Sequence, residues 1–171
     1  MKTVIVFGAT GLIGAYFSVE YCKKYNIVAV GGRKDDGGFF ESKGIKYYSI
    51  DIADRDAFSK IVENDIYAVI HLAGIMPATM NGYNPSLYIE TNLKGTLNVL
   101  DFCVEKNVNR IVFGQSRADS NYLMGKTPIP SDIVKKFPLT GDHSIYSICK
   151  NASVDLIEHY YHQFGIKRFI L

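Results

Sequence analysis

Three glycines near the N-terminus constrain the fold of this chain more than any other feature. The chain begins MKTVIVFGATGLIG, so an apolar run of strand length is followed by three glycines in a GxxGxxG spacing. The first permits a tight turn, the second lets a pyrophosphate approach the backbone, and the third lets a helix pack closely on the strand. The helix N-terminus then faces the anion. The sequence therefore predicts a nucleotide-binding turn formed by Gly8, Thr10, Gly11, Leu12, Ile13 and Gly14.

Length and composition predict one globular domain. The 171 residues are 47% apolar, which is enough for a sizeable core, and we expect residues 1–171 to form a single dinucleotide-binding domain. The net charge of +2 comes with no dense basic run, and no apolar stretch has the length of a membrane span. We expect neither nucleic acid nor a membrane as a partner, and no metal site. The three cysteines show no CxxC spacing, which favours a reducing cytoplasm.

Apolar runs alternate with helical stretches along the whole chain. This alternation predicts an α/β Rossmann fold, in which a doubly wound parallel sheet of order 3-2-1-4-5-6 carries helices on both faces. We expect strands at 3–7, 27–30, 45–50, 68–72, 110–113 and 167–171. We expect helices at 12–25, 54–64, 85–106 and 144–164. The long loops 74–84 and 117–142 then lie at the carboxyl ends of strands, where such folds bind ligands.

A tyrosine and a lysine four residues apart give the clearest catalytic signal. Tyr146 and Lys150 share one face of an expected helix. Free tyrosine ionises near pH ~10, and a neighbouring lysine stabilises the phenolate, so the pair predicts a general acid or base. The same spacing also occurs by chance on helix surfaces, and the upstream glycines are what favour the catalytic reading.

The motifs together resemble those of the extended short-chain dehydrogenase/reductase family. The resemblance covers essentially the whole chain and points to its nucleotide-sugar epimerase, dehydratase and reductase branch. Its motifs here are GATGLIG at 8–14, Asp51-Ile52, His71-Leu72-Ala73-Gly74, Asn92 with Gly95-Thr96, Ser116, and Tyr146 with Lys150.

The resemblance implies a role for each catalytic residue. Tyr146 would exchange a proton with a substrate hydroxyl or ketone, and Ser116 would hydrogen-bond the same oxygen. Lys150 would hold the nicotinamide ribose and tune Tyr146. Because serine is common in turns, Ser116 also has a purely structural reading.

Other matched positions would hold the cofactor or support the fold. Asp51 would meet the adenine with Ile52 beside the ring, although Asp51 could instead cap the next helix. The segment Leu72, Ala73 and Gly74 would line the cleft. We expect His71 to be a core histidine and Asn92 to be a structural support.

Departures from the family pattern narrow the expected chemistry. Arg117 and Ala118 stand where dehydratases of the family have an Asp-Glu pair, which disfavours a 4,6-dehydratase. The stretch Phe113-Gly114-Gln115-Ser116 replaces the family's usual serine run, so substrate contacts there cannot be transferred.

The end of the second expected strand bears on cofactor choice. NAD enzymes place an acidic residue there, whereas this chain has Arg33 and Lys34, which could pair with a 2′-phosphate. The sequence thus favours NADP over NAD. In the alternative, both cations are solvated and Asp35 or Asp36 turns back to the ribose.

We therefore expect an NAD(P)-dependent oxidoreductase or epimerase acting on a nucleotide-activated sugar. The alternative is a non-catalytic, redox-sensing dinucleotide-binding module. Because the chain ends within an expected strand, we expect the C-terminal substrate domain to be missing and this piece to be poorly active. A homodimer through the helices at 85–106 and 144–164 is also expected from the resemblance.

Overall fold

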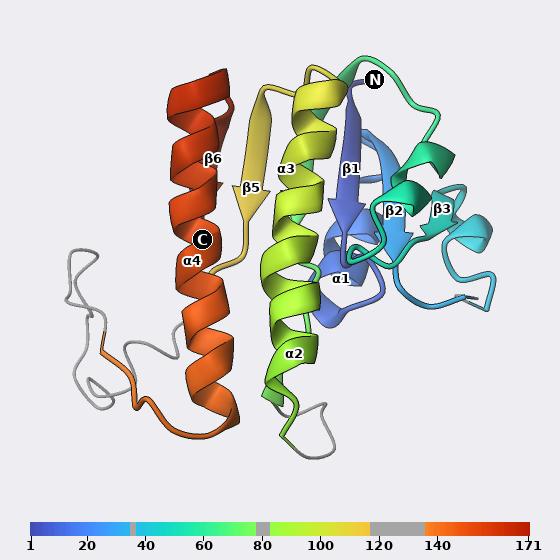
Figure 1. Cartoon of the computed structure of the whole chain (residues 1–171). Coiled ribbons are helices and arrows are strands. Elements are labelled where there is room, and N and C mark those ends of the chain that lie inside the picture. The colour runs from blue at the N-terminus through green and yellow to red at the C-terminus, as the bar shows by residue number, and fades with distance from the viewer. Residues whose placement is uncertain (35–36, 78–82, 117–135) are drawn as a thin grey trace, which may run out of the picture.

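A six-stranded parallel sheet forms the centre of the molecule (Figure 1). The computed structural model describes residues 1–34, 37–77, 83–116 and 136–171. The strands run in the order β3-β2-β1-β4-β5-β6, as predicted. Their bounds are β1 Thr3–Phe7, β2 Asn26–Gly31, β3 Lys46–Ser49, β4 Ile66–His71, β5 Arg110–Phe113 and β6 Lys167–Ile170.

Helical segments connect the strands. The α-helices are α1 Leu12–Tyr21, α2 Pro85–Tyr88, α3 Gly95–Glu105 and α4 Asp142–Phe164. Short 3₁₀ segments are η1 Glu41–Lys43 and η2 Asp56–Lys60, and η4 Ile89–Lys94 is a π-helical segment. The C-cap of α4 is Gly165, whose left-handed backbone (φ 73°) ends the helix after Phe164, which is the predicted last residue.

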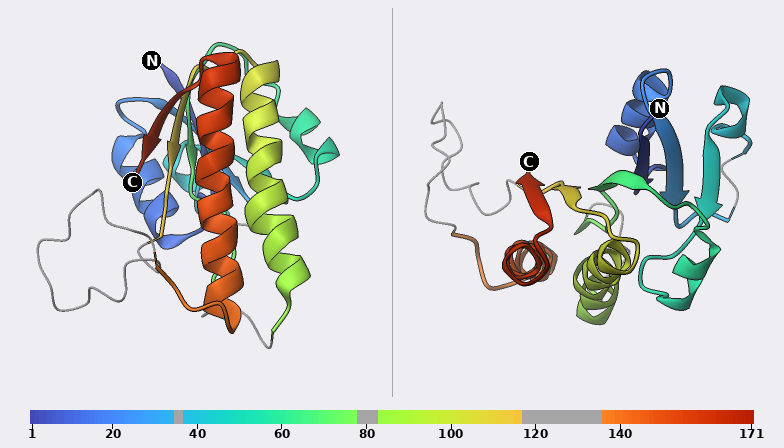
Figure 2. Two further views of the ribbon diagram at one scale, coloured as in Figure 1. Left: turned by 60° about the vertical axis from the view of Figure 1, so that its left-hand side comes forward. Right: turned by 90° about the horizontal axis from the view of Figure 1, so that it is seen from above.

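Both faces of the sheet are covered. Viewed along the strands, α1 lies on one side, and α3 and α4 lie side by side on the other (Figure 2). Within β1, Val4 and Val6 pack into the core on the α1 side, whereas Ile5 and Phe7 pack into the core against α3. Successive side chains of a strand point to opposite faces, so burial on both faces requires apolar residues at every position from Val4 to Phe7.

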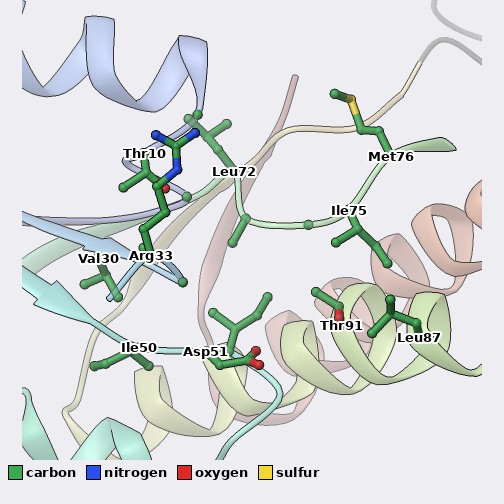
Figure 3. A pocket seen from close by; sticks show the side chains of 17 residues that line it. Thr10, Val30, Arg33, Ile50, Asp51, Leu72, Ile75, Met76, Leu87 and Thr91 are labelled. Carbon is green, nitrogen blue, oxygen red and sulfur yellow. The ribbon is translucent and has the colours of Figure 1, made fainter. Parts of the chain in front are cut away.

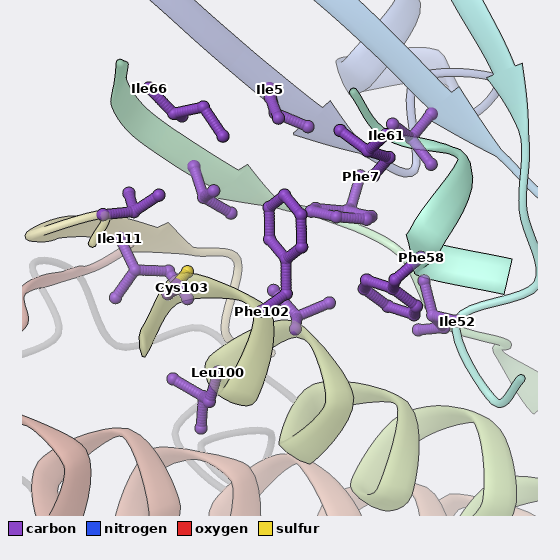
Figure 4. Close-up of a cluster of buried hydrophobic side chains, with 14 of the residues drawn as sticks. Ile5, Phe7, Ile52, Phe58, Ile61, Ile66, Leu100, Phe102, Cys103 and Ile111 are labelled. Atoms are coloured by element: carbon purple, nitrogen blue, oxygen red, sulfur yellow. The ribbon is translucent and has the colours of Figure 1, made fainter. Parts of the chain in front are cut away.

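The larger core lies between the sheet and α3. Phe7 contacts Phe58 and Phe102, with ring centroids 5.5 and 5.8 Å apart, and aliphatic side chains surround these rings (Figure 4). Phe58 comes from η2 and Phe102 from α3, so this aromatic cluster joins three parts of the chain. Tilted and edge-to-face ring pairs of this kind stabilise a core beyond simple area burial.

The helix predicted at 54–64 is wrong, since only the five-residue 3₁₀ segment η2 forms there. The N-cap of η2 is Arg55, and Asp54, which was expected to cap the helix, precedes it and accepts the Asp56 N–H at 3.1 Å through its Oδ1. The chain then becomes extended at Ile61. The Glu63 carboxylate bonds Lys46 at 2.7 Å and accepts a hydrogen bond from the Tyr48 hydroxyl, and this long-range pairing with β3 replaces the expected last helical turns.

The other helix predictions differ in detail. The first helix ends at Tyr21 rather than at residue 25, and Cys22 follows it in a turn. The segment predicted at 85–106 is helical, but it consists of α2, η4 and α3. A π-helical turn inside an α-helix rotates the side chains that follow it, and such turns are frequent at functional sites.

The strand order places a crevice at one end of the sheet. The chain passes from β1 to β2 on one side and from β4 to β5 on the other, so the order reverses between β1 and β4. Ligands of open α/β sheets bind outside the carboxyl ends of the strands at such a point. None of the helices in the described residues has the length and apolar character needed to cross a membrane.

Candidate active site

The glycine turn adopts the conformation that the motif predicts. Gly8 has φ 84°, and a Cβ there would lie 2.5 Å from the Ala73 backbone nitrogen. A Cβ on Gly14 would lie 2.3 Å from the Gly8 carbonyl oxygen, so the start of α1 packs directly on the turn. At Gly11 the nearest atom would be the Gly8 oxygen at 3.3 Å, which leaves this backbone accessible from the cleft. The turn therefore fits a pyrophosphate.

The cleft beside this turn has two compartments. The first has a volume of about 520 Å³ and lies over the ends of β1, β2 and β4 (Figure 3). The second has a volume of about 390 Å³ and reaches the start of α4. Both compartments share the residues Gly8, Gly11, Leu72, Ala73, Gly74, Ile75 and Met76, so they form one continuous site.

Arg33 lines the first compartment, on the same side as Thr10 (Figure 3). The Tyr47 hydroxyl lies 2.7 Å from the Arg33 carbonyl oxygen and 3.2 Å from that of Gly31, which fixes the loop after β2. A Cβ on Gly31 would lie 2.7 Å from Thr10 Cγ2, so the lack of a side chain at Gly31 lets the end of β2 pack against the glycine turn. Lys34 is exposed and lies outside the described lining of the cleft.

Asp51 and Ile52 line the opposite wall of the first compartment. Asp51 Oδ1 accepts the Ala53 N–H at 2.9 Å, so this carboxylate stabilises its own turn as well as facing the cleft. Ile52 is buried against Gly95, where a Cβ would lie 2.6 Å from Ile52 Cδ1. This tight contact holds the Asp51–Ile52 segment against the start of α3.

The second compartment brings Tyr146 and Lys150 to the glycine turn. It is lined by both residues and by Leu12, Ile13 and Gly14. Tyr146 and Lys150 come from one face of α4, one helical turn apart, as the YxxxK spacing predicts. A phenol, an ammonium and the glycine turn thus meet in a single cleft.

Lys150 is 9% exposed. Its ammonium donates a hydrogen bond to the Gly114 carbonyl oxygen and lies 3.9 Å from the centre of the Phe113 ring. Burial lowers the pKa of Lys150 from 10.5 to about 8. The contacts with β5 hold the amine in place at the edge of the cleft.

Ser116 is partly buried and follows Gln115 at the end of a described segment. The Ser116 N–H donates to Gln115 Oε1 at 3.0 Å, and the Gln115 amide nitrogen lies 3.4 Å from Asn151 Oδ1. The described lining of the cleft includes Gln115 but not Ser116. Contact of Ser116 with a substrate therefore stays a prediction.

His71 lies in the core at the end of β4, 1% exposed. Its Nε2 lies 3.0 Å from Thr96 Oγ1, and the Thr96 hydroxyl donates to the Asn92 carbonyl oxygen at 2.6 Å. Burial, together with the positive charge of Lys150, lowers the pKa of His71 to about 3. A neutral histidine in this network supports the fold, in line with the expected structural role.

Several residues of the site were not predicted. Gln115 and Met76 line the cleft, and the ring of Tyr88 packs beside Tyr146. Gln115 adjoins Ser116 at a strand end, which is a usable sequence signal, whereas Tyr88 lies in a helix with no motif to mark it. Arg117 and Ala118, whose identity bears on dehydratase chemistry, lie outside the described residues.

The whole arrangement matches a known family. The model of the NAD dependent epimerase/dehydratase family matches residues 4–171. The chain belongs to this family. The predicted resemblance to nucleotide-sugar epimerases of the extended short-chain dehydrogenase/reductase type is thereby confirmed.

Relatives with assigned activities include epimerases and a dehydratase. The chain is 32% identical over 127 residues to a UDP-glucuronate 4-epimerase of Thermodesulfobacterium geofontis, covering 74% of this chain and 38% of the relative. It is 29% identical to UDP-glucose 4-epimerase of Bacillus subtilis, covering 80% and 41% of the two chains. It is 28% identical to an inverting UDP-N-acetylglucosamine 4,6-dehydratase of Campylobacter jejuni, covering 77% and 42%.

Solved structures share the fold. UDP-glucose 4-epimerase from Bifidobacterium longum, in complex with NAD⁺ and UDP, superposes with a TM-score of 0.80 at 23% identity, covering 99% of this chain and 52% of that one. L-threonine dehydrogenase from Clostridium difficile gives 0.82 at 22% identity, covering 100% and 52%. The chain thus spans about two fifths of the length of the sequence relatives named above and about half that of these structures.

Proposed function

We propose that this chain carries the cofactor and acid–base site of an enzyme that epimerises or reduces a nucleotide-activated sugar. One observation carries the proposal: a single cleft joins the glycine turn to Tyr146 and Lys150. Three relatives named above act on UDP-sugars, as their names state, and this supports a nucleotide sugar as the substrate class.

The residues present fit a nicotinamide dinucleotide. Gly11 leaves room for a pyrophosphate at the N-terminus of α1, Asp51 and Ile52 would border the adenine, and Lys150 would hold the nicotinamide ribose. When bound, such a cofactor supplies a hydride acceptor and donor. The seven shared residues between the compartments, including Leu72, Ala73 and Gly74, would line the path between its two ends.

The protein's own residues would handle the proton. Tyr146 would take a proton from a sugar hydroxyl, or return one to a ketone, as the hydride moves. Lys150 sits one turn away, and its positive charge would stabilise the phenolate. Ser116 would hydrogen-bond the same substrate oxygen and orient it, so that positioning contributes much of the rate.

We propose NADP rather than NAD as the preferred cofactor. Arg33 lines the compartment over the end of β2, where its guanidinium could pair with a 2′-phosphate. An NADP preference would favour net reduction of a keto sugar over epimerisation, because an epimerase regenerates its own cofactor. The structural neighbour from Bifidobacterium longum holds NAD⁺, so the proposal for this chain rests on Arg33 alone.

Epimerase and reductase chemistry are both compatible with the site. The Arg117-Ala118 sequence disfavours 4,6-dehydration, since elimination in the resembled dehydratases uses an Asp-Glu pair there. The enzyme should nevertheless be assayed for dehydratase activity as well, because one relative is a 4,6-dehydratase.

Replacing Tyr146 tests the proposed function. In the full-length protein, Tyr146→Phe should abolish turnover of nucleotide sugars while the affinity for the cofactor stays unchanged. Tyr161→Phe, which removes a hydroxyl further along α4, serves as the matched control and should keep full activity. Retained turnover in Tyr146→Phe would refute the assignment and favour a dinucleotide-binding sensor.

We also propose that the protein is a homodimer. An apolar groove of about 560 Å³ runs between η4, α3 and α4, and Ile89, Leu93, Leu97 and Leu156 line it. A second copy would cover these leucines and bury them. Leu93→Asp should give a monomer in light scattering, whereas Ile148→Asp, on an exposed position of α4 outside the groove, should leave the dimer intact.

A cytoplasmic location is proposed from the cysteines. Cys22, Cys103 and Cys149 are all free. Free buried thiols such as Cys103 persist where the compartment is reducing.

A further inference from the structure

Tyr88 has a buried hydroxyl without a hydrogen-bond partner among the described residues. Its side chain is 0% exposed, and it is the largest fully buried side chain in the part of the molecule that the structure describes. A buried hydroxyl is normally hydrogen-bonded, because its hydration is lost on folding. A phenylalanine would fill the same space without this cost, so the hydroxyl calls for an explanation.

The neighbouring segments fix Tyr88 beside Tyr146. Tyr88 ends α2, whose first turn is capped by Asn84 Oδ1 accepting the Leu87 N–H at 3.2 Å. The ring of Tyr88 meets that of Tyr146 with centroids 6.5 Å apart and planes inclined at 67°. This edge-to-face contact is a favoured arrangement of aromatic rings, and it restricts how the Tyr146 ring can turn.

The surroundings keep the Tyr88 hydroxyl protonated. Burial, and after it the negative charges of Asp142 and Tyr146, raise the pKa of Tyr88 above its usual value of 10.0. A neutral phenol beside a phenolate is a hydrogen-bond donor. The other ionisable side chains on α4 as far as Lys150 are His143, Cys149 and Lys150. Those on η4 are Glu90 and Lys94, which pair at 2.9 Å.

We propose that Tyr88 is a positioning residue whose hydroxyl donates a hydrogen bond to the Tyr146 oxygen when that oxygen is ionised. The hydroxyl has no partner among the described residues, and a phenolate oxygen is a stronger acceptor than a phenol, so this bond would strengthen as Tyr146 loses its proton. Tyr88 would then stabilise the basic form of Tyr146 from the buried side, while Lys150 does so from α4. The inference rests on the proposed acid–base role of Tyr146.

Labelling of Tyr146 by an aryl sulfonyl fluoride tests this role without turnover. The phenolate oxygen attacks sulfur, a sulfonate ester forms and fluoride leaves, so the rate reports the ionised fraction. Mass spectrometry of the tryptic peptide gives the rate for Tyr146. In Tyr88→Phe we expect labelling about tenfold slower near pH ~7.5, and labelling equal to that of the parent near pH ~11, above the usual pKa of a phenol.

The controls separate positioning from structure. Tyr161→Phe should label at Tyr146 like the parent, and Tyr88→Phe should not unfold at a lower temperature, since it removes an unpartnered hydroxyl. Equal labelling in parent and Tyr88→Phe at both pH values would overturn the inference. Slower labelling at both pH values, or a lowered unfolding temperature, would show a structural role and would overturn it as well.

The parent chain separates this inference from the proposed function. If Tyr146 in the parent labels no faster than Tyr161 near pH ~7.5, the acid–base assignment itself fails, and the inference fails with it. If Tyr146 labels rapidly but does not respond to Tyr88→Phe, the proposed function stands and only the role of Tyr88 is refuted.

Discussion

Asn92 and Ile75 form two hydrogen bonds that hold the loop after β4 to the helical side of the cleft. The Ile75 N–H donates to Asn92 Oδ1 at 2.8 Å, and the Asn92 amide donates to the Ile75 carbonyl oxygen at 3.0 Å. Asn92 lies in the π-helical segment η4 and is 2% exposed. The amide thus satisfies both backbone groups of a residue that lines both compartments.

Replacement of Asn92 should destabilise the chain and weaken cofactor binding together. Asn92→Ala leaves the Ile75 N–H and C=O without partners, at a cost of about 2 kcal/mol in the free energy of unfolding. Urea unfolding and titration with NADPH measure the two effects. Asn98→Ala, which loses a single buried bond to the Ile52 carbonyl oxygen, should cost less. Parent-like stability in Asn92→Ala would contradict this account.

Arg33 should determine the preference between the two nicotinamide cofactors. Arg33→Ala removes the guanidinium from the first compartment, and we expect NADPH affinity to fall about tenfold while NADH affinity stays unchanged. Nicotinamide fluorescence during titration measures both affinities. Lys34→Ala is the matched control and should have little effect, since Lys34 lies outside the described lining. An equal loss of affinity for both cofactors would argue against a phosphate contact.

The buried Lys150 should make the free energy of unfolding rise with pH in the alkaline range. Its pKa falls from 10.5 in the unfolded chain to about 8 in the folded one, so between these values only the unfolded chain binds the proton. The free energy of unfolding should therefore rise with pH across this window, with a contribution of up to about 1.4 kcal/mol per pH unit. Lys150→Met should lose this contribution, and Lys94→Met, at an exposed position, should keep it.

His71 should make the free energy of unfolding depend on pH in the acid range. Its pKa falls from 6.5 to about 3 on folding, so between these values the unfolded chain binds the extra proton. Stability is then lost as the pH falls through this window. His71→Gln removes the ionisable group, and its unfolding free energy should depend less on pH than that of the parent. His143→Gln, on an exposed residue, should follow the parent curve, and identical curves for all three chains would refute the prediction.

The cleft could be predicted from sequence wherever a single local motif defines it. The glycine turn, the YxxxK pair and the segment Leu72–Gly74 each line the cleft as expected, because each depends on residues close together in the chain. Lys34 does not line it, since the charge of a side chain says nothing of its direction. Tyr88 could not be predicted, because its contact with Tyr146 joins two distant elements, whereas Gln115 could have been found from its place beside Ser116 at a strand end.

By itself, the sequence determined the sheet and the glycine turn that follows β1. Every strand of the sheet was predicted to within two residues at either end. The central strands β1, β2 and β4 are buried on both faces and apolar over most of their length, and glycines mark where β1 turns. Only the tertiary structure decided where helices break. The 3₁₀ segment η2 ends at Lys60, and Glu63, just beyond it, pairs with Lys46 of β3. In the other helical region, the π-helical segment η4 places Asn92 where it bonds Ile75. These breaks depend on partners far apart in the chain, and no local pattern encodes such partners.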